Sequence, residues 1–379
     1  MKHYFYLNPP HTIAVTFEKL LRASVPFTER SDPESRRVCV DSEGGSGDVY
    51  YSVRSAWDVF LTVQKFPQGS EIIMSGINIP HMAEIVQIHG LTPVYADIDQ
   101  RDLLPTLEEI KSKRTVKTVA VLCAHLFGSW SSLDAISAWC RQVGLLFVED
   151  CAQSFMGRDF SGTSVADVTL FSFGTIKRST ALGGAVVFVR RSDLRRKMLA
   201  CQAAYREASV SSYRRKCLKV AVLKICCWPW VYASVVNIVK LFGCDPEKLL
   251  RESVRGFPTS SLPHALRFKP HVRLEKMVIE CWLESSRADW LRHGQRVKNY
   301  LEKYVGIEST IAGNGAQLQS HWLVPILSKD PLEFLQLCRR SGMDATRGVT
   351  SLSALAGQYT PNSISLLQQI VYFPARRYL

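Results

Sequence analysis

Six short apolar runs, separated by stretches that favour helices, constrain the fold of this chain more than any other feature. They are Glu71–Met74, Pro93–Ala96, Thr118–Cys123, Leu145–Glu149, Thr169–Phe173 and Ala185–Val189. Runs that are apolar throughout are typical of strands covered on both faces. Helices are expected between them at about Ser55–Gln64, His81–Gly90, Pro105–Ser112 and Leu133–Val143. This alternation predicts an α/β fold with a mostly parallel sheet, in which ligands bind beyond the carboxyl ends of the strands.

The length of 379 residues indicates one large domain and a smaller one. We expect the large domain at residues 1–255 and a small C-terminal α+β domain at residues 256–379. The small domain is predicted from His321–Leu327, Pro331–Ser341 and the segment around Thr346–Leu352. Hydrophobic residues make up 46% and charged residues 21% of the chain, which excludes wholesale disorder.

The net charge of +13 favours anionic partners, which include phosphate esters, nucleic acid and an anionic bilayer surface. No nucleic-acid-binding motif accompanies the charge, so no nucleic-acid partner is predicted. The eleven cysteines are odd in number and form no C-x-x-C pair, which indicates a reducing compartment rather than a disulfide scaffold, and no metal site is predicted. The N-terminal sequence MKHYFYLNPPHT has no apolar core of signal-peptide length. A cytoplasmic location is expected, with peripheral association at the inner membrane surface as the alternative.

A basic and apolar insertion is expected at about residues 195–255. Within it, Ile225–Val239 is an uncharged run of 15 residues that contains Pro229, so it is short for a membrane span. Basic flanks together with Trp228 and Trp230 fit a helix lying in a membrane interface, which would make residues 214–240 a contact with an anionic membrane. A hairpin buried in the core or in a subunit interface fits the run equally well.

Three residues that could share one chemistry follow the fourth and fifth apolar runs. Asp150 and Ser172 lie at the ends of two predicted strands, and Lys177 lies in the next loop. Two strands of one sheet that end side by side can bring these groups to a single pocket. Pyridoxal phosphate (PLP) chemistry needs this trio: a lysine amine for the Schiff base, a carboxylate for the pyridinium nitrogen, and hydroxyls for the phosphate.

Motifs at regular spacings surround the trio. They are Gly69-Ser70-Glu71-Ile72-Ile73, Gly90-Leu91-Thr92-Pro93-Val94 with Asp97-Ile98-Asp99, Ala124-His125-Leu126-Phe127-Gly128, Glu149-Asp150-Cys151-Ala152-Gln153, Ala166-Asp167 before Ser172-Phe173, and Gly183-Gly184 after Lys177. In this order the chain closely resembles the sugar aminotransferases of the DegT/DnrJ/EryC1/StrS family. That resemblance implies the fold-type-I architecture of PLP enzymes, a three-layer sandwich, with a smaller α+β domain. It also implies a homodimer with its active site at the subunit interface.

The resemblance also implies individual roles. Lys177 forms the Schiff base with PLP and moves the substrate proton, and Asp150 keeps the pyridine nitrogen protonated. Gln153 lies beside the 3-hydroxyl of the ring. Ser172 binds the phosphate.

The phosphate turn departs from the family pattern. The family's S-G-T-A-A is replaced by Ser52-Val53-Arg54-Ser55-Ala56, in which Arg54 and Ser55 are expected to hold the phosphate at a helix N-terminus, unless Arg54 is an exposed arginine. The aromatic residue that stacks on the ring aligns with Ile79, so either His81 stacks instead or no aromatic residue does. The partner-subunit motif G-Y-N-x-R has no clean match, and Arg255-Gly256-Phe257 is the nearest.

The small domain carries weaker signals. His321-Trp322 resembles the family's H-x-W-H-L segment, which makes His321 a substrate-binding candidate. Arg347 is expected either to contact a substrate carboxylate or phosphate or to be a structural surface arginine. The chain ends at Leu379, where family members continue, so the domain is expected to lack its last helix.

Three hypotheses about function remain at the level of the sequence. The first is a PLP-dependent aminotransferase that moves an amino group, with glutamate as the expected donor, onto a nucleotide-linked keto-sugar or similar anionic keto substrate. The second is a membrane-associated PLP aminotransferase that acts on a lipid-linked or amphiphilic keto compound. The third is a catalytically inactive, cofactor-binding regulatory relative, which the altered phosphate turn motivates.

Overall fold

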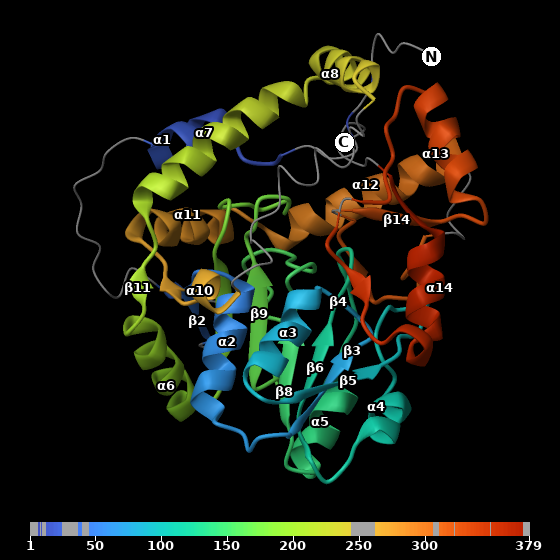
Figure 1. The fold of residues 1–379 in the computed structure, drawn as a ribbon. Coiled ribbons are helices and arrows are strands. Elements are labelled where there is room, and N and C mark those ends of the chain that lie inside the picture. The colour runs from blue at the N-terminus through green and yellow to red at the C-terminus, as the bar shows by residue number, and fades with distance from the viewer. Residues whose placement is uncertain are drawn as a thin grey trace.

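The computed structural model of the chain describes residues 7, 9, 13–24, 37–39, 45–243, 262–305, 311–321, 323–348 and 350–373. Its centre is an eight-stranded sheet in the order β1-β2-β10-β9-β8-β6-β3-β5 (Figure 1). In that order the strands are Arg37–Cys39, Ser46–Tyr50, Ala185–Val189, Val168–Ser172, Leu146–Asp150, Thr118–Ala124, Glu71–Ser75 and Thr92–Ala96. The strands from β9 to β5 are parallel, whereas β10 is antiparallel to both β9 and β2, and β1 is antiparallel to β2. The predicted mostly parallel sheet is confirmed.

Helices cover both faces of this sheet, which makes three layers. One face packs against α2 (Val53–Gln64), α3 (Pro80–Ile88), α6 (Ser192–Ala203) and α10 (Leu262–Leu266). The other face packs against α4 (Leu107–Lys113), α5 (Asp134–Gln142) and α11 (Val272–Leu283). Because successive strand residues point to opposite faces, Ile72 of β3 belongs to the first of these cores and Ile73 to the second.

A second, smaller unit follows α12 (Arg287–Val305). Strand β14 (Val324–Leu327) pairs antiparallel with β16 (Ile370–Phe373), next to α13 (Pro331–Arg340) and α14 (Pro361–Gln369). Two separate pairs of short strands connect this unit to the segments that follow β3 and β6: β15 (Ser353–Ala354) pairs with β4 (Ile77–Asn78), and β13 (Leu318–Gln319) with β7 (Ser129–Trp130). A 3-10 turn spans Gly357–Tyr359. The boundary predicted at 255/256, the motif at Arg255-Gly256-Phe257 and the C-terminal residues after Phe373 lie outside the described residues.

The predicted insertion forms two helices, α7 (Val210–Cys226) and α8 (Pro229–Leu241). It is preceded by β11 (Arg206–Glu207), which pairs with β12 (Phe268–Lys269), and α7 packs along α1 (Phe17–Ser24). Within the described residues no single helix is long and apolar enough to cross a membrane, but α7 and α8 pass that test as a pair bent by 93°. Trp228 and Trp230 are 55% and 65% exposed, so this segment is not a hairpin buried in the core of the chain.

Candidate functional site

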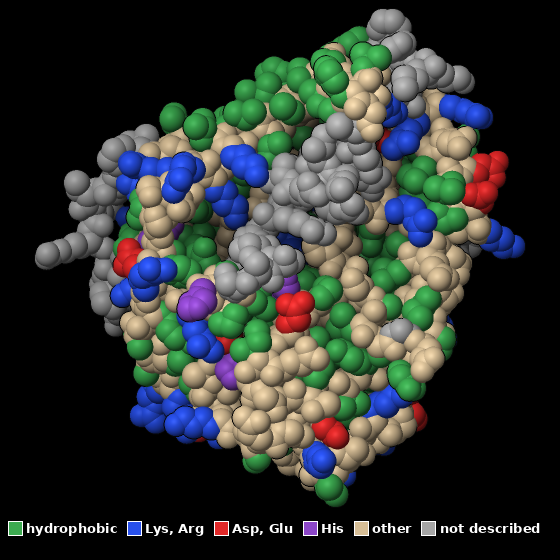
Figure 2. All heavy atoms as spheres, viewed as in Figure 1, with side chains coloured by type: hydrophobic (Ala, Val, Ile, Leu, Met, Phe, Trp, Pro, Cys, Tyr) green, Lys and Arg blue, Asp and Glu red, His purple; other side chains and the backbone are tan. Residues whose placement is uncertain are grey.

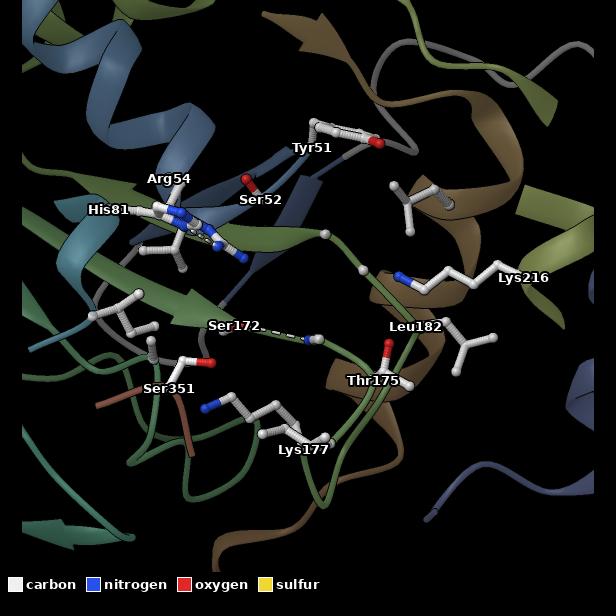
Figure 3. Close-up of a pocket in the computed structure, with 18 of the residues that line it drawn as sticks. Tyr51, Ser52, Arg54, His81, Ser172, Thr175, Lys177, Leu182, Lys216 and Ser351 are labelled. Atoms are coloured by element: carbon white, nitrogen blue, oxygen red, sulfur yellow. Dashed lines mark hydrogen bonds between the residues drawn. The ribbon is translucent and has the colours of Figure 1, made fainter. Parts of the chain in front are cut away.

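A cavity of about 1420 Å³ lies beyond the carboxyl ends of β8 and β9, where parallel sheets bind their ligands. The N-terminal ends of α2 and α3 form one side of this cavity, and the loop after β9 forms its floor. Helix α7 supplies another wall, from which Lys216 extends in Figure 3, and Arg347, Gly348 and 350–353 of the small unit also line the cavity. The site is therefore assembled from segments far apart in the sequence.

Lys177 and Asp150 line this one cavity, as the sequence predicted. Asp150 is the last residue of β8, whereas the backbone N–H of Lys177 donates to Gly174 O in the turn that follows β9. Burial lowers the pKa of Lys177 to about 7; the nearby Asp150 carboxylate opposes this shift and Arg54 adds to it. About half of the Lys177 amine is therefore neutral near pH 7, the state in which an amine can act as a nucleophile or a base.

Asp150 is held as a buried acceptor at the end of its strand. Its side chain is almost inaccessible, and its Oδ1 accepts a hydrogen bond from the backbone N–H of Ala152 at 2.9 Å. Burial raises the pKa of Asp150, while the Ala152 N–H and the charges of Lys177 and His125 act in the opposite direction. A carboxylate in this position can accept a hydrogen bond from, or pair with, a cationic group that enters the cavity.

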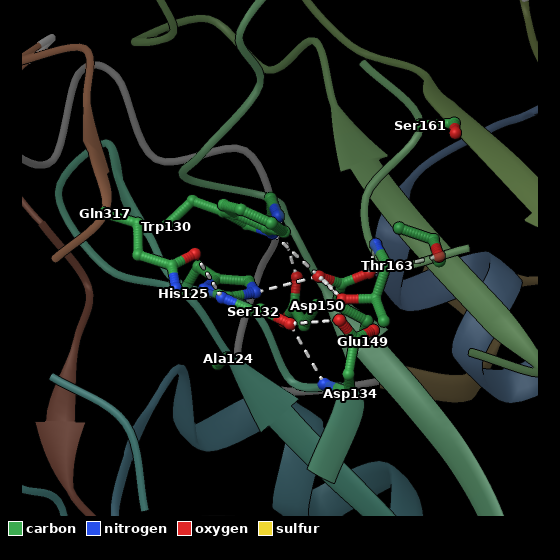
Figure 4. Close-up of polar contacts among 12 residues, drawn as sticks. Ala124, His125, Trp130, Ser132, Asp134, Glu149, Asp150, Ser161, Thr163 and Gln317 are labelled. Carbon is green, nitrogen blue, oxygen red and sulfur yellow. Dashed lines mark hydrogen bonds and ion pairs between the residues drawn. The ribbon is translucent and has the colours of Figure 1, made fainter. Parts of the chain in front are cut away.

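A polar network behind Asp150 fixes the end of β8 (Figure 4). The neighbouring residue, Glu149, is fully buried, and its carboxylate accepts from Trp130 Nε1 at 3.0 Å and from Thr163 N at 2.6 Å, and pairs with His125 Nε2 at 2.9 Å. Burial raises the pKa of Glu149, but the hydrogen bond and charge of His125, together with the hydrogen bonds from Thr163 and Trp130, outweigh it, so that the pKa lies below its usual value. The network holds the charged Glu149 carboxylate one residue before Asp150.

Replacing Glu149 is expected to destabilise the fold. Glu149→Ala removes the shared acceptor of several buried donors, which we expect to lower the free energy of unfolding by about 3–5 kcal/mol. Urea unfolding of the purified protein measures this change. Glu108→Ala, at an exposed glutamate in the first turn of α4, is the control and should change that free energy by less than about 1 kcal/mol. Equal effects of the two substitutions would contradict the role of Glu149.

The N-terminus of α2 lies in the cavity wall. Ser52 caps the helix, and its Oγ accepts from the backbone N–H of Ser55 at 3.0 Å. The first backbone N–H groups of a helix and its dipole favour a phosphate at this position. Ser52, Arg54 and Ser172 line the cavity, whereas Ser55 is buried behind Ser52, with 2.8 Å between the two hydroxyl oxygens. The structure thus offers the hydroxyl of Ser52 to the cavity where the sequence suggested that of Ser55.

Arg54 and His81 lie together on this wall. An Arg54 Nη1 donates to His81 Nδ1 at 2.9 Å, so that His81 accepts with this nitrogen, and Figure 3 shows both side chains beside Ser52. Burial lowers the pKa of Arg54 to about 10, which still leaves a cation at neutral pH. Both Ile79 and His81 line the cavity, so which of them covers a ring stays a prediction.

Gln153 also lines the cavity, and its amide oxygen accepts from the backbone N–H of Phe127 at 3.0 Å. This hydrogen bond orients the NH₂ end of the side chain as the donor for a ligand. The predicted neighbour of a ring hydroxyl therefore lies in the same cavity as Lys177 and Asp150.

The two substrate-binding candidates of the small unit differ in their position relative to the cavity. Arg347 lines the cavity, and one of its guanidinium nitrogens donates to Gln368 O at 2.7 Å. His321 is buried and is not among the residues that line the cavity; burial lowers its pKa to about 4, and the Lys298 charge adds to that shift. The geometry supports Arg347 more than His321 as a contact for a ligand.

Sequence reasoning missed the basic wall that α7 contributes. Lys216 extends into the cavity in Figure 3, and burial lowers its pKa to about 8, with Arg54 and Lys219 contributing in the same direction. Arg215 and Lys219 line the same wall. The run Arg214-Arg215-Lys216 is the available signal, and from the sequence it is predicted only as part of the basic and apolar insertion. Tyr51, Thr175 and Ser351 also line the cavity.

Residues 51–218 match the model of the DegT/DnrJ/EryC1/StrS aminotransferase family. A dTDP-4-dehydro-2,3,6-trideoxy-D-glucose 4-aminotransferase of Saccharopolyspora spinosa is 30% identical over 140 residues, which are 36% of this chain and 36% of the relative. A UDP-N-acetyl-3-dehydro-alpha-D-glucosamine 3-aminotransferase of Acidithiobacillus ferrooxidans is 34% identical over 134 residues, which are 34% of this chain and 36% of the relative. The match thus spans about a third of the length of these curated relatives.

Solved structures resemble the chain over a larger part of its length. S. venezuelae DesV in complex with a ketimine intermediate has a TM-score of 0.63 at 15% identity, and the match covers 94% of this chain and 88% of DesV. NtdA from Bacillus subtilis with bound cofactor PMP has a TM-score of 0.56 at 16% identity, with 86% and 68% covered. At these identities the likeness establishes the fold, so the predicted three-layer architecture of such aminotransferases is confirmed.

Proposed function

We propose that this chain, whose residues 51–218 match the model of the DegT/DnrJ/EryC1/StrS aminotransferase family, is a PLP-dependent aminotransferase that moves an amino group from glutamate to a nucleotide-linked keto-sugar. One observation carries the proposal. The amine of Lys177, with its pKa lowered to about 7 by burial, shares a cavity with the buried carboxylate of Asp150. An amine and a carboxylate in this arrangement are the two groups that PLP chemistry requires of a protein.

The residues present fit PLP. The Lys177 amine matches the aldehyde and the Asp150 carboxylate matches the pyridine nitrogen. Ser52 and Arg54 at the start of α2, together with Ser172 at the end of β9, match the phosphate. When bound, PLP supplies an aldehyde that condenses with amines and a protonated ring that withdraws electrons from the substrate carbon.

Each of these side chains then has a defined task. Lys177, whose pKa of about 7 leaves part of its amine neutral near pH 7, would act as the base that takes the proton from the substrate carbon and holds it for return. Asp150 would hold the proton of the ring nitrogen by its negative charge. Arg54 and the N–H groups of α2 would hold the phosphate, and the NH₂ end of Gln153 would be the donor for the ring hydroxyl.

The charge of the cavity supports an anionic acceptor. Lys216 of α7, Arg347 of the small unit and Arg54 of α2 line the cavity with cations, which suit the diphosphate of a nucleotide-linked sugar. The names of the two curated relatives include dTDP- and UDP-linked sugars, which supports the same substrate class. A homodimer with the site at the subunit interface also belongs to this proposal.

The half-reaction with glutamate tests the proposal directly. Purified holoprotein mixed with glutamate and no acceptor is expected to lose its absorbance in the aldimine region and to release 2-oxoglutarate in an amount equal to the protein. Nucleotide-linked keto-sugars are then screened for the recovery of that absorbance. The same experiment with alanine in place of glutamate is the control for the identity of the amino donor. A holoprotein that shows no spectral change with any amino acid would contradict the assignment and favour a regulatory, inactive relative.

A second acceptor class is an amphiphilic or lipid-linked keto compound. The favouring observation is that α7 places the apolar side chains of Val220 and Leu223 beside Lys216 in the same wall, so a ligand with both an anionic and an apolar part can be accommodated. Including such compounds in the acceptor screen separates the two classes.

A further inference from the structure

Helices α7 and α8 carry a large exposed apolar surface, which we call the α7–α8 face. It consists of Leu218, Val222, Ile225, Trp228, Trp230, Val235, Ile238, Leu241 and Phe242. Their exposed fractions range from 38% for Val235 to 80% for Phe242. Figure 2 shows hydrophobic side chains gathered along the upper edge of the molecule, over α7 and α8. Contiguous exposed apolar surface of this kind marks a docking site.

Helix α7 is apolar on two opposite sides. Tyr213, Cys217 and Val220 recur at helical spacing and are buried against the body of the protein. Leu218, Val222 and Ile225 recur at the same spacing and are exposed. A surface helix needs only one apolar stripe to pack on its own domain, so the second stripe calls for a partner outside the described part of the chain.

Hydrogen bonds fasten both helices to the body of the protein. On α7, Tyr213 Oη donates to Ala181 O at 2.8 Å and Lys224 Nζ donates to Ile13 O at 3.1 Å. On α8, Tyr232 Oη donates to Asp344 Oδ2 at 2.7 Å. Since both helices are held along the surface and bend by 93° between them, the pair presents its face to a surface rather than crossing a bilayer.

The charge of α7 and α8 indicates what kind of partner surface the α7–α8 face can bind. Residues 210–241 contain six Lys or Arg side chains and no Asp or Glu. Arg215 and Lys219 are exposed and lie one helical turn from Leu218 and Val222, and Trp228 and Trp230 lie at the bend. Apolar side chains with flanking cations and tryptophans are the composition of helices that lie in the interface of an anionic membrane.

We propose that the α7–α8 face docks the protein peripherally on an anionic lipid bilayer, with its apolar side chains among the acyl chains and Arg215 and Lys219 at the lipid phosphates. This inference does not depend on the proposed reaction. A second copy of the chain is a poorer occupant, because a two-fold contact sets the same surface against itself. That contact would bring cations of two copies together with no acidic side chain from either helix pair between them.

Docking in this orientation has a consequence for the cavity. Lys216, Val220 and Leu223 line the cavity from the same helix whose other side carries Leu218 and Val222. The bilayer would therefore lie against the outer side of a cavity wall, one helix diameter from the bound ligand.

Vesicle co-sedimentation of the full-length holoprotein tests the proposal. The wild type is expected to sediment with vesicles of equimolar phosphatidylcholine and phosphatidylglycerol, and at least about tenfold less with phosphatidylcholine alone, since each basic side chain near an anionic surface adds roughly 1 kcal/mol. The double variant Leu218→Glu/Val222→Glu is expected to lose at least about tenfold of its binding to the anionic vesicles. Leu332→Glu/Leu337→Glu, which changes two exposed leucines on α13, is the matched control and should bind as the wild type does.

Thermal melting and the visible absorbance of each variant confirm that it is folded and loaded with cofactor. Wild-type protein that fails to bind the anionic vesicles would overturn the proposal. So would equal binding by the wild type and Leu218→Glu/Val222→Glu, because binding would then arise elsewhere on the basic surface. Size-exclusion chromatography with light scattering tests whether a second copy of the chain covers the face instead. If the wild type does not bind vesicles but is a dimer, and Leu218→Glu/Val222→Glu is a monomer, the face is assigned to a second copy.

Discussion

Lys177→Ala is expected to abolish the visible absorbance of the PLP-loaded protein and to lower the rate of the glutamate half-reaction by at least about 10³-fold. The reason is that Lys177 supplies both the amine that holds the cofactor and the base that moves the proton, and either loss alone is costly. Absorbance spectra of the wild type and the variant at equal PLP, followed by rapid-mixing kinetics with glutamate, measure both effects.

Two further variants sharpen this prediction. Lys177→Arg keeps a cation in the cavity but offers no amine that condenses with an aldehyde, so it should fail as completely as Lys177→Ala. Lys216→Ala removes the other cavity lysine with a lowered pKa and should keep the visible absorbance. Borohydride reduction and peptide mass spectrometry should place the cofactor on Lys177. A label on Lys216, or absorbance that survives in Lys177→Ala, would refute the assignment.

Asp150→Asn is expected to slow the glutamate half-reaction by about 10²–10³-fold, because the neutral amide no longer stabilises a positive charge on the ring nitrogen. The same substitution should make the capture of PLP by the apoprotein faster at low pH. The Asp150 carboxylate raises the pKa of Lys177, so its removal should lower that pKa below about 7.

The pH dependence of capture separates the two effects. The apoprotein captures PLP through the neutral amine, whose fraction increases as the pH rises through the pKa of Lys177. The capture rate of the wild type should therefore rise with a midpoint near pH 7, and that of Asp150→Asn at a lower pH. Asp159→Asn, at an exposed aspartate that does not line the cavity, is the control and should match the wild type in both measurements. An unchanged capture midpoint in Asp150→Asn would show that the two groups do not interact.

The sequence by itself determined six of the eight strands of the sheet and the core of the site, whereas β1 and β2 were not predicted. The six apolar runs became β3, β5, β6, β8, β9 and β10, because a short run of apolar residues favours a strand packed within a sheet whatever distant residues cover it. Asp150 and Ser172 end adjacent parallel strands, and Lys177 follows within a few residues of the second. The connectivity of a parallel sheet therefore placed these groups at one edge without further information.

Tertiary structure decided which residues from outside that sheet reach the cavity. Lys216 lies in a basic run that reads as a solvated surface, yet the packing of Tyr213 and Cys217 turns it inward. Ser55 and His321 were reasonable candidates by motif, but the cap geometry of α2 and the fold of the small unit bury both away from the ligand space. The spacing of hydrophobic residues indicates that one side of a helix is covered, but it does not indicate which segment of the chain covers it. Which neighbour covers it depends on contacts between segments distant in the chain, and only the folded structure contains them.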